Sequence, residues 1–441
     1  MKLRINPAIS YSLLFKAWQA GAGLITIPFV ITYLGPVVQG YYYTFASLIA
    51  LQSFFELGFG IVISVYASHE WYKLRLDDEG KIAGDGNARS RIVSLGRFVF
   101  SYFGLAALAY LATISIVGFY ILGRNNESDV NWVAPWFLHI AFSAASLWLM
   151  PFLNLMEGCN QVASVAKFRL LQSIVANAVL WIALIAGGEL WSIPLGSAVN
   201  VLFLVGFLGI AKKGFFLSFR QPPAAEKISW RDDLLPMQWR LAVQGLFSYL
   251  TFPLYTVLAY SYFGPIQAGR MGMTLQVIAG IQSFSLVLIV ARAPELALLA
   301  ASGDRPSLIA RWKQASTRSL ALMLGFFLLL ALAQEIAGRF MVSGLSRMLP
   351  VEICAILSAG ALIAGVIQCI AVYLRAHKRE LLTFVGVTSG ALYGLSAWLL
   401  CRNFGAMGIA VSYLAVTALV VLPLTLQVLS ASRRRLRVAV S

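Results

Sequence analysis

Long apolar stretches alternate with short polar and basic segments along the whole 441-residue chain. A helix needs about 20 apolar residues to cross the hydrocarbon core of a bilayer, so each stretch predicts one membrane-spanning helix. Twelve such spans are predicted, at residues 9–33, 38–66, 99–122, 134–156, 164–187, 190–211, 241–263, 267–291, 319–340, 351–374, 381–401 and 406–430. The pattern therefore predicts an all-α membrane protein with twelve transmembrane helices.

The composition agrees with this prediction. The chain is 59% hydrophobic and 12% charged, too apolar for one soluble core. Its four cysteines have no CxxC or metal-ligand spacing, and its three histidines have no acidic neighbours at ligand spacing. We therefore expect a multi-pass membrane protein with no metal site and no cofactor.

The positions of the cations predict an orientation. Placing both termini in the cytoplasm puts 28 of the 34 Lys and Arg residues on that side, five outside, and Lys16 inside the first span. Cytoplasmic loops are enriched in Lys and Arg, so we expect this arrangement in the inner membrane. Attraction to anionic lipid headgroups accounts for the net charge of +16 without a nucleic-acid partner.

The chain divides into two halves of six spans. A polar connection at 212–240, interrupted by two prolines, separates residues 1–211 from residues 241–441. Six is an even number, so the two halves insert in the same orientation. Parallel repeats of this kind place the substrate at the repeat interface near the membrane midplane.

Two short motifs occur at equivalent places in both halves. Gly-Pro-x-x-x-Gly occurs at 35–40 and again at 264–269, and Gln-Ser-Phe occurs at 52–54 and again at 282–284. The offsets of 229 and 230 residues differ by a single insertion. Gly-Pro is common at helix turns, so each match alone is weak, whereas both together indicate an internal repeat.

The sequence around the first two spans also resembles a known family. The segment Pro28–Ala67 contains YLGPxxxGY at 33–41 and ELGFG at 56–60, and looks like the start of O-antigen (Wzx-type) polysaccharide flippases. That family belongs to the superfamily that includes MATE multidrug exporters and lipid II flippases. The segments RAPE at 292–295 and GD at 303–304 resemble the matching place in the second half.

The resemblance implies a fold and a function. The fold would be a MATE-like, V-shaped pair of six-helix bundles. The function would be to move an undecaprenyl-pyrophosphate-linked oligosaccharide, an O-antigen or exopolysaccharide repeat unit, to the outer leaflet of the inner membrane. A polysaccharide polymerase or export machinery would be a possible partner. Lipid II flippases typically carry two further spans, which the hydropathy pattern does not predict here.

One face of the first span is polar. Its positions recur at steps of three or four residues, which places them on one side of a helix, and they are Ser12, Lys16, Gln19, Gly23 and Thr26. Lipid does not tolerate such a face, so it must meet other helices or water. A cavity and a hydrogen-bonded helix contact both satisfy this condition. Pro28 is expected to bend the same helix.

Lys16 and Glu56 are the candidate charged site. Glu56, with Gln52 and Gly60 on the same face of the antiparallel second span, lies at a depth comparable to that of Lys16. An ion pair between the two is possible. Either they neutralise each other, or Lys16 binds an anionic headgroup while Glu56 tunes it or accepts a proton.

The other polar positions give weaker signals. Arg270, at the outer end of the eighth span, either lines a periplasmic mouth or anchors the helix end. Asn154 and Asn200 lie inside spans, where interhelical hydrogen bonding is the usual role. The candidate substrate-binding residues are therefore Lys16, Gln19, Gln52, Glu56 and Arg270.

Two other function classes compete with a flippase. A MATE-like cation-coupled multidrug exporter would need an acidic residue in the first span, which contains Lys16 and no Asp or Glu. An enzyme acting on polysaccharide would need an extended outer loop with catalytic acids. The longest predicted outer loop, 123–134, carries only Glu127 and Asp129, so we expect a transporter and no enzyme.

Overall fold

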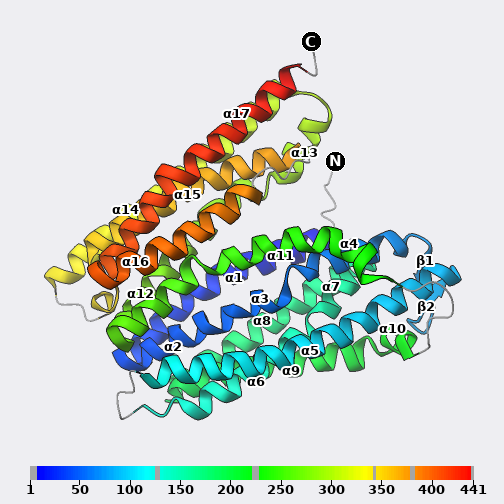
Figure 1. Cartoon of the computed structure of the whole chain (residues 1–441), viewed down its shortest axis with the longest axis horizontal. Helices are drawn as coiled ribbons and strands as arrows, with labels where there is room; N and C mark the ends of the chain where they lie inside the picture. The colour runs from blue at the N-terminus through cyan, green and yellow to red at the C-terminus, as the bar shows by residue number, and fades with distance from the viewer. Residues whose placement is uncertain (1–6, 125–129, 221–227, 341–343, 378–382, 439–441) are drawn as a thin grey trace. The chain divides into compact units, whose positions relative to one another are not determined.

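The computed structural model describes residues 7–124, 130–220, 228–340, 344–377 and 383–438 (Figure 1). Almost all of these residues are helical. Within the described residues, nine helices are long and apolar enough to cross a membrane, or ten if a bent pair is counted as one span. The prediction of a predominantly helical, multi-pass membrane protein is therefore confirmed, although two short strands at 74–76 and 82–84 depart from a purely α-helical chain. The number of twelve spans and the cytoplasmic position of both termini stay predictions.

The chain forms two compact units. The N-terminal unit comprises residues 1–19 and 48–246, and the C-terminal unit comprises residues 20–47 and 247–441. Residues 20–47, which the sequence assigned to the first half, thus belong to the C-terminal unit. The division at the 212–240 connection into two six-span bundles stays a prediction.

The N-terminal unit is built from helices and one short sheet. The first part of α1 (Pro7–Tyr33) contributes to it. The other helices are η1 (Ala50–Gln52), α3 (Ser53–Glu56), α4 (Phe59–Trp71), α5 (Gly86–Arg124), α6 (Val133–Leu149), α7 (Pro151–Gly158), α8 (Val162–Ile185), η2 (Glu189–Trp191), α9 (Ser192–Gly206), η3 (Phe207–Ala211), α10 (Lys213–Leu217), η4 (Ser218–Arg220), η5 (Trp230–Leu234) and α11 (Leu235–Tyr249). An antiparallel pair, β1 (Leu74–Leu76) and β2 (Ile82–Gly84), completes the unit.

The described residues of the C-terminal unit form helices joined by short turns, with no strand. Its elements are the second part of α1, α2 (Pro36–Ile49), α12 (Phe252–Val290), α13 (Ala293–Ala301), α14 (Arg305–Arg339), η6 (Leu345–Arg347), α15 (Val351–Ala376), α16 (Thr383–Val416), η7 (Thr417–Val421) and α17 (Leu422–Val438). Its core contains a buried cluster that joins Leu296 and Leu308 to Leu374 of α15.

Two of the apolar helical stretches contain a break. Phe252–Ala301 is interrupted at Gly264, with φ 80° and ψ −178°, and Phe384–Ser432 is interrupted at Gly405, with φ 59° and ψ −143°. Glycine adopts positive φ without the steric cost of a side chain. Both breaks lie where the sequence placed a turn between two predicted spans.

The chain reverses direction at the second break. A methyl group on Gly408 would collide with the carbonyl oxygen of Leu400. In one straight helix these two residues would lie about 12 Å apart, at 1.5 Å per residue. Their close approach shows that the segments on either side of Gly405 fold back on each other.

The two copies of the Gly-Pro-x-x-x-Gly motif lie against each other in the C-terminal unit. A methyl group on Gly40 would collide with the backbone of Pro265, and one on Gly269 would lie 3.0 Å from the backbone nitrogen of Gly40. The side-chain Nε2 of Gln39 donates a hydrogen bond to the Gly269 carbonyl at 3.1 Å. The repeated glycines therefore allow two helices to cross at backbone distance.

Candidate functional site

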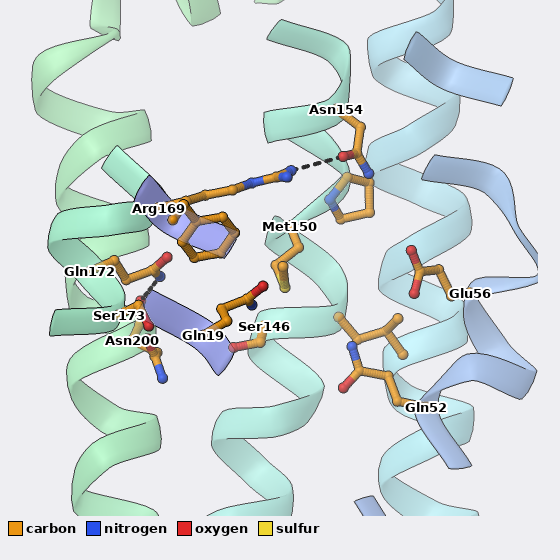
Figure 2. Close-up of a pocket in the computed structure, with 13 residues that line it drawn as sticks. Gln19, Gln52, Glu56, Ser146, Met150, Asn154, Arg169, Gln172, Ser173 and Asn200 are labelled. Atoms are coloured by element: carbon orange, nitrogen blue, oxygen red, sulfur yellow. Dashed lines mark hydrogen bonds between the residues drawn. The ribbon is translucent and has the colours of Figure 1, made fainter. Parts of the chain in front are cut away.

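A polar pocket of about 570 Å³ lies inside the N-terminal unit. It is formed by side chains from α1, the η1–α3 segment, α6, α7, α8 and α9 (Figure 2). The lining residues are Phe15, Gln19, Gln52, Glu56, Ser146, Leu147, Met150, Pro151, Asn154, Arg169, Gln172, Ser173 and Asn200. Amides and hydroxyls dominate this lining, with one carboxylate and one guanidinium.

A break in the chain places Glu56 at the pocket. Gln52 and Glu56 are four residues apart and so share one face of the η1–α3 segment. The helix ends there because Leu57 and Gly58 both adopt left-handed backbone conformations, with φ 49° and 68°. The chain then restarts as α4, and the two helical segments are bent by 42°.

Gly60 allows α7 to approach this turn closely. A methyl group on Gly60 would lie 2.6 Å from Nδ2 of Asn154 and 3.3 Å from Oε1 of Glu56. Any side chain at this position would push Asn154 away. The absence of a side chain at Gly60 therefore brings the Asn154 amide and the Glu56 carboxylate to the same part of the pocket.

Arg169 is the cation that lines the pocket. Its Nη2 donates to Oδ1 of Asn154 at 3.0 Å, and its Nη1 lies 3.3 Å from Oε1 of Glu157. Figure 2 shows Arg169 extending from α8 toward Asn154, with Glu56 and Gln52 on the other side of the pocket. The two contacts on α7 fix the guanidinium, because they use its two terminal nitrogens.

Two glutamine side chains of the pocket, Gln52 and Gln172, are each held by a hydrogen bond to one of their two amide atoms. Ser143 donates to Oε1 of Gln52 at 3.1 Å, and Tyr110 lies 3.0 Å from the Ser143 hydroxyl. Across the pocket, Nε2 of Gln172 donates to the backbone carbonyl of Asn200 at 2.7 Å. These contacts orient both side chains before any ligand binds.

The other ends of these groups are available to a ligand. Nε2 of Gln52, Nδ2 of Asn154 and Oε1 of Gln172 make no hydrogen bond with the residues that the structure describes. Within the same residues the Glu56 carboxylate has no ion-pair partner. The pocket thus presents donors and acceptors side by side. No group of three or more His, Cys, Asp or Glu residues in the described part of the chain could hold a metal ion.

The structure brings together three of the five residues that the sequence singled out. Gln19, Gln52 and Glu56 all line the pocket. Lys16 lies one turn before Gln19 on α1, is exposed, and is not part of the lining. The ion pair between Lys16 and Glu56, which the sequence allowed, is not formed in the described residues. Arg169 is the cation on the pocket wall instead.

Arg270 lies elsewhere. It is half-buried on α12 in the C-terminal unit, and its backbone carbonyl accepts a hydrogen bond from Oγ1 of Thr274 at 2.8 Å. It does not line the pocket of the N-terminal unit. Its role at a periplasmic mouth stays a prediction.

The sequence did not single out Arg169, Gln172 and Ser173. It gave interhelical hydrogen bonding as the default role of Asn154 and Asn200, which also line the pocket. A signal was present, because Arg169 lies inside the predicted span 164–187. A charged residue within a span marks a functional position by default. The prediction that Lys16 is the cation inside a span overlooked Arg169.

Searches of family models and of curated proteins find no match to this chain. Solved structures do match it. An inward-facing multidrug resistance MATE family transporter of the MOP superfamily is 12% identical, with a TM-score of 0.66 and coverage of 98% of this chain and 97% of that one. The lipid II flippase MurJ, in an inward closed conformation, is 14% identical, with a TM-score of 0.63 and coverage of 95% and 87%.

A Vibrio cholerae MATE transporter, VcmN, extends the comparison. It is 13% identical, with a TM-score of 0.55 and coverage of 97% of this chain and 96% of that one. Identities this low show the fold alone. The chain therefore has the fold shared by MATE transporters and MurJ over nearly its whole length, and the predicted MATE-like architecture is confirmed at this level.

Proposed function

We propose that this protein, a multi-pass membrane protein with the fold of MATE transporters and MurJ, is a flippase for a lipid-linked oligosaccharide. The substrate would be an undecaprenyl-pyrophosphate-linked repeat unit, moved from the cytoplasmic to the outer leaflet of the inner membrane. Alternating access of a central passage would carry the sugars across while the lipid tail stays in the bilayer.

The polar pocket of the N-terminal unit carries this proposal. Oriented amides, hydroxyls and a carboxylate inside an apolar helix bundle are costly unless they serve a polar ligand. Sugars present hydroxyl and acetamido groups that match such a lining. Lipid tails or apolar drugs would leave these groups without partners.

Lys16 is the proposed contact for the pyrophosphate. It is exposed on α1, one helical turn from the pocket residue Gln19. A lysine ammonium is a common partner of phosphate groups. A sugar in the pocket and a pyrophosphate near Lys16 would then be bound by adjacent parts of one helix.

A MATE-like cation-coupled multidrug exporter is the second candidate, because MATE transporters share the fold. Two observations favour the flippase. The first span contains no Asp or Glu that could hold a coupling cation. Phe15 is the single aromatic side chain in the pocket lining, whereas amphipathic drugs bind to mainly apolar and aromatic surfaces.

Reconstituted transport tests the proposal. The purified protein would be placed in liposomes with an undecaprenyl-pyrophosphate disaccharide, and movement between leaflets would be followed by enzymatic access to the sugar. We expect transport by the wild type and a loss of at least about tenfold in Lys16→Ala, which removes a charge–phosphate contact. A loss of similar size is expected in Glu56→Ala, which removes a charged acceptor for a sugar hydroxyl. Lys167→Ala, an exposed cation on α8, is the control.

Deletion in the native host separates the two candidates. A flippase predicts lipid-linked repeat units trapped on the cytoplasmic face, restored by the wild-type gene and not by Lys16→Ala. Normal surface glycan together with altered resistance to cationic drugs would assign the protein to the exporters instead.

A further inference from the structure

The geometry points to a specific substrate class: we infer that the pocket accepts an uncharged, hydroxyl- and acetamido-bearing glycan and discriminates against glycans that carry a carboxylate. This inference rests on the proposed function and concerns only the sugar-binding part of the same site. Glu56 and Glu157 are the residues that set the preference.

The first step of the inference is the net charge at the pocket. Arg169 is the only cation among the residues that the structure places in the pocket lining, and its guanidinium is already paired with Glu157 at 3.3 Å. Glu56 adds a second carboxylate on the opposite wall (Figure 2). The three groups sum to −1 when Glu56 is ionised and to zero when it is protonated. Neither state leaves a spare positive charge for an acidic sugar.

The fixed position of Arg169 carries the second step. Its two terminal nitrogens contact Glu157 and Asn154, both on α7. Arg169 and Glu157 are each about three-quarters buried, with 23% and 24% of their side chains exposed. Turning the guanidinium toward an incoming carboxylate would leave Glu157 partly buried and unpaired, which is costly.

The hydrogen-bonding groups carry the third step. Gln52 and Asn154 present free NH₂ donors, while Gln172 and Glu56 present acceptors, as described above. Sugar hydroxyls both donate and accept, and an acetamido group has one N–H and one carbonyl. A neutral amino sugar therefore satisfies this set. A carboxylate can only accept, so it would leave the Gln172 acceptor unmatched and would be repelled by the Glu56 carboxylate.

The test compares two transport probes that share the same undecaprenyl pyrophosphate. One carries a disaccharide of N-acetylhexosamines, and the other carries a glucuronic acid as its terminal sugar. We expect the wild type to move the neutral probe at least about tenfold faster, the discrimination produced by one like-charge contact in the pocket. Equal rates for the two probes would overturn the inference.

Variants that replace a glutamate by the neutral glutamine identify the residues that set the preference for a neutral glycan. Glu56→Gln is expected to reduce the preference severalfold, and Glu56→Gln combined with Glu157→Gln, which leaves Arg169 unpaired, to reverse it. Glu352→Gln, at an exposed glutamate on α15, is the matched control and should leave the ratio unchanged. The double variant would first be shown to be folded by a cooperative thermal unfolding transition. If it then keeps the wild-type ratio of the two transport rates, Glu56 and Glu157 do not set the preference.

Binding of the free disaccharides in detergent supplies an independent readout. The neutral disaccharide is expected to bind at least about tenfold more tightly than its uronate counterpart, and Glu56→Gln should narrow that ratio. If neither lipid-linked probe is transported, the flippase proposal fails, and the binding ratio still decides the sugar preference. Tighter binding of the uronate would overturn the inference in that case as well.

Discussion

Arg169 contributes both to helix packing and to the pocket to which we assign the substrate. It links α8 to α7 through Asn154 and Glu157, and it also forms part of the pocket wall. Lys167, two residues earlier on the same helix, is exposed and is not part of that wall. Comparing substitutions of Arg169 and Lys167 therefore separates the effect of losing a positive charge from the effect of its position.

Arg169→Gln is expected to lower both transport and stability. The change leaves Glu157 without its ion-pair partner, which costs about 2 kcal/mol for a hydrogen-bonded charged group. Thermal unfolding in detergent and the liposome transport assay would measure the two losses. Lys167→Gln should match the wild type in both assays, and equal losses in the two variants would contradict a specific role for Arg169.

The cap of α14 illustrates a local contribution to a single helix. Asp304 precedes the helix, and its Oδ1 accepts a hydrogen bond from the backbone nitrogen of Ser307 at 3.1 Å. Hydrogen bonds from the side chain and the backbone of Ser307 lower the pKa of Asp304 below its ordinary value of 3.8. The ionised carboxylate is thus the form that caps the helix.

This cap predicts a pH dependence with a definite sign. Its contribution is fully present above the ordinary pKa of 3.8 and is lost as the pH falls below that value toward the lowered folded pKa. Asp304→Ala should reduce the unfolding temperature at pH 7, and the difference from the wild type should shrink between pH 4 and pH 3. Asp304→Asn should keep the cap at each pH. A difference that grows as the pH falls would contradict this account.

The crossing of the two repeated motifs determines how closely α2 and α12 approach. Gly40 and Gly269 leave no space for a side chain at this crossing, whereas a methyl group on Gly35 meets nothing within 4 Å. Gly40→Ala should destabilise the protein by about 1–3 kcal/mol, the usual cost of overpacking. Gly35→Ala is the control. Unfolding in detergent would compare the two, and equal stability would show that the helices separate at little cost.

The orientation in the membrane and the number of spans are properties of the whole molecule, and cysteine labelling tests both. The four native cysteines are buried, so a background of surface labelling is not expected. Glu79→Cys, in the turn between β1 and β2, should react with a membrane-impermeant maleimide only after the cells are opened. Asn403→Cys, exposed beside the break at Gly405, should react in intact cells. The opposite pattern would reverse the predicted orientation, and protection of Asn403→Cys in intact cells would contradict a turn on the outside.

The sequence alone determined the membrane character, the helical class and several pocket residues. An apolar run of about 20 residues can be recognised locally, because each spanning helix must be long enough to cross the hydrocarbon core whichever helices it packs against. Polar positions within such runs are also readable locally, and this is why Gln19, Gln52 and Glu56 were found. The repeated Gly-Pro motif was readable in the same way, as a backbone requirement at a turn.

Only the tertiary structure decided which of these residues meet. Arg169 reaches the pocket because α8 lies beside α7, and Gly60 together with the left-handed turn at Leu57 and Gly58 sets the position of Glu56. Residues 20–47 likewise belong to the C-terminal unit because they contact residues more than 200 positions away in the sequence, as Gly40 contacts Pro265. Hydropathy carries no information about these contacts, because partners distant in sequence fix the register and depth of helices against one another.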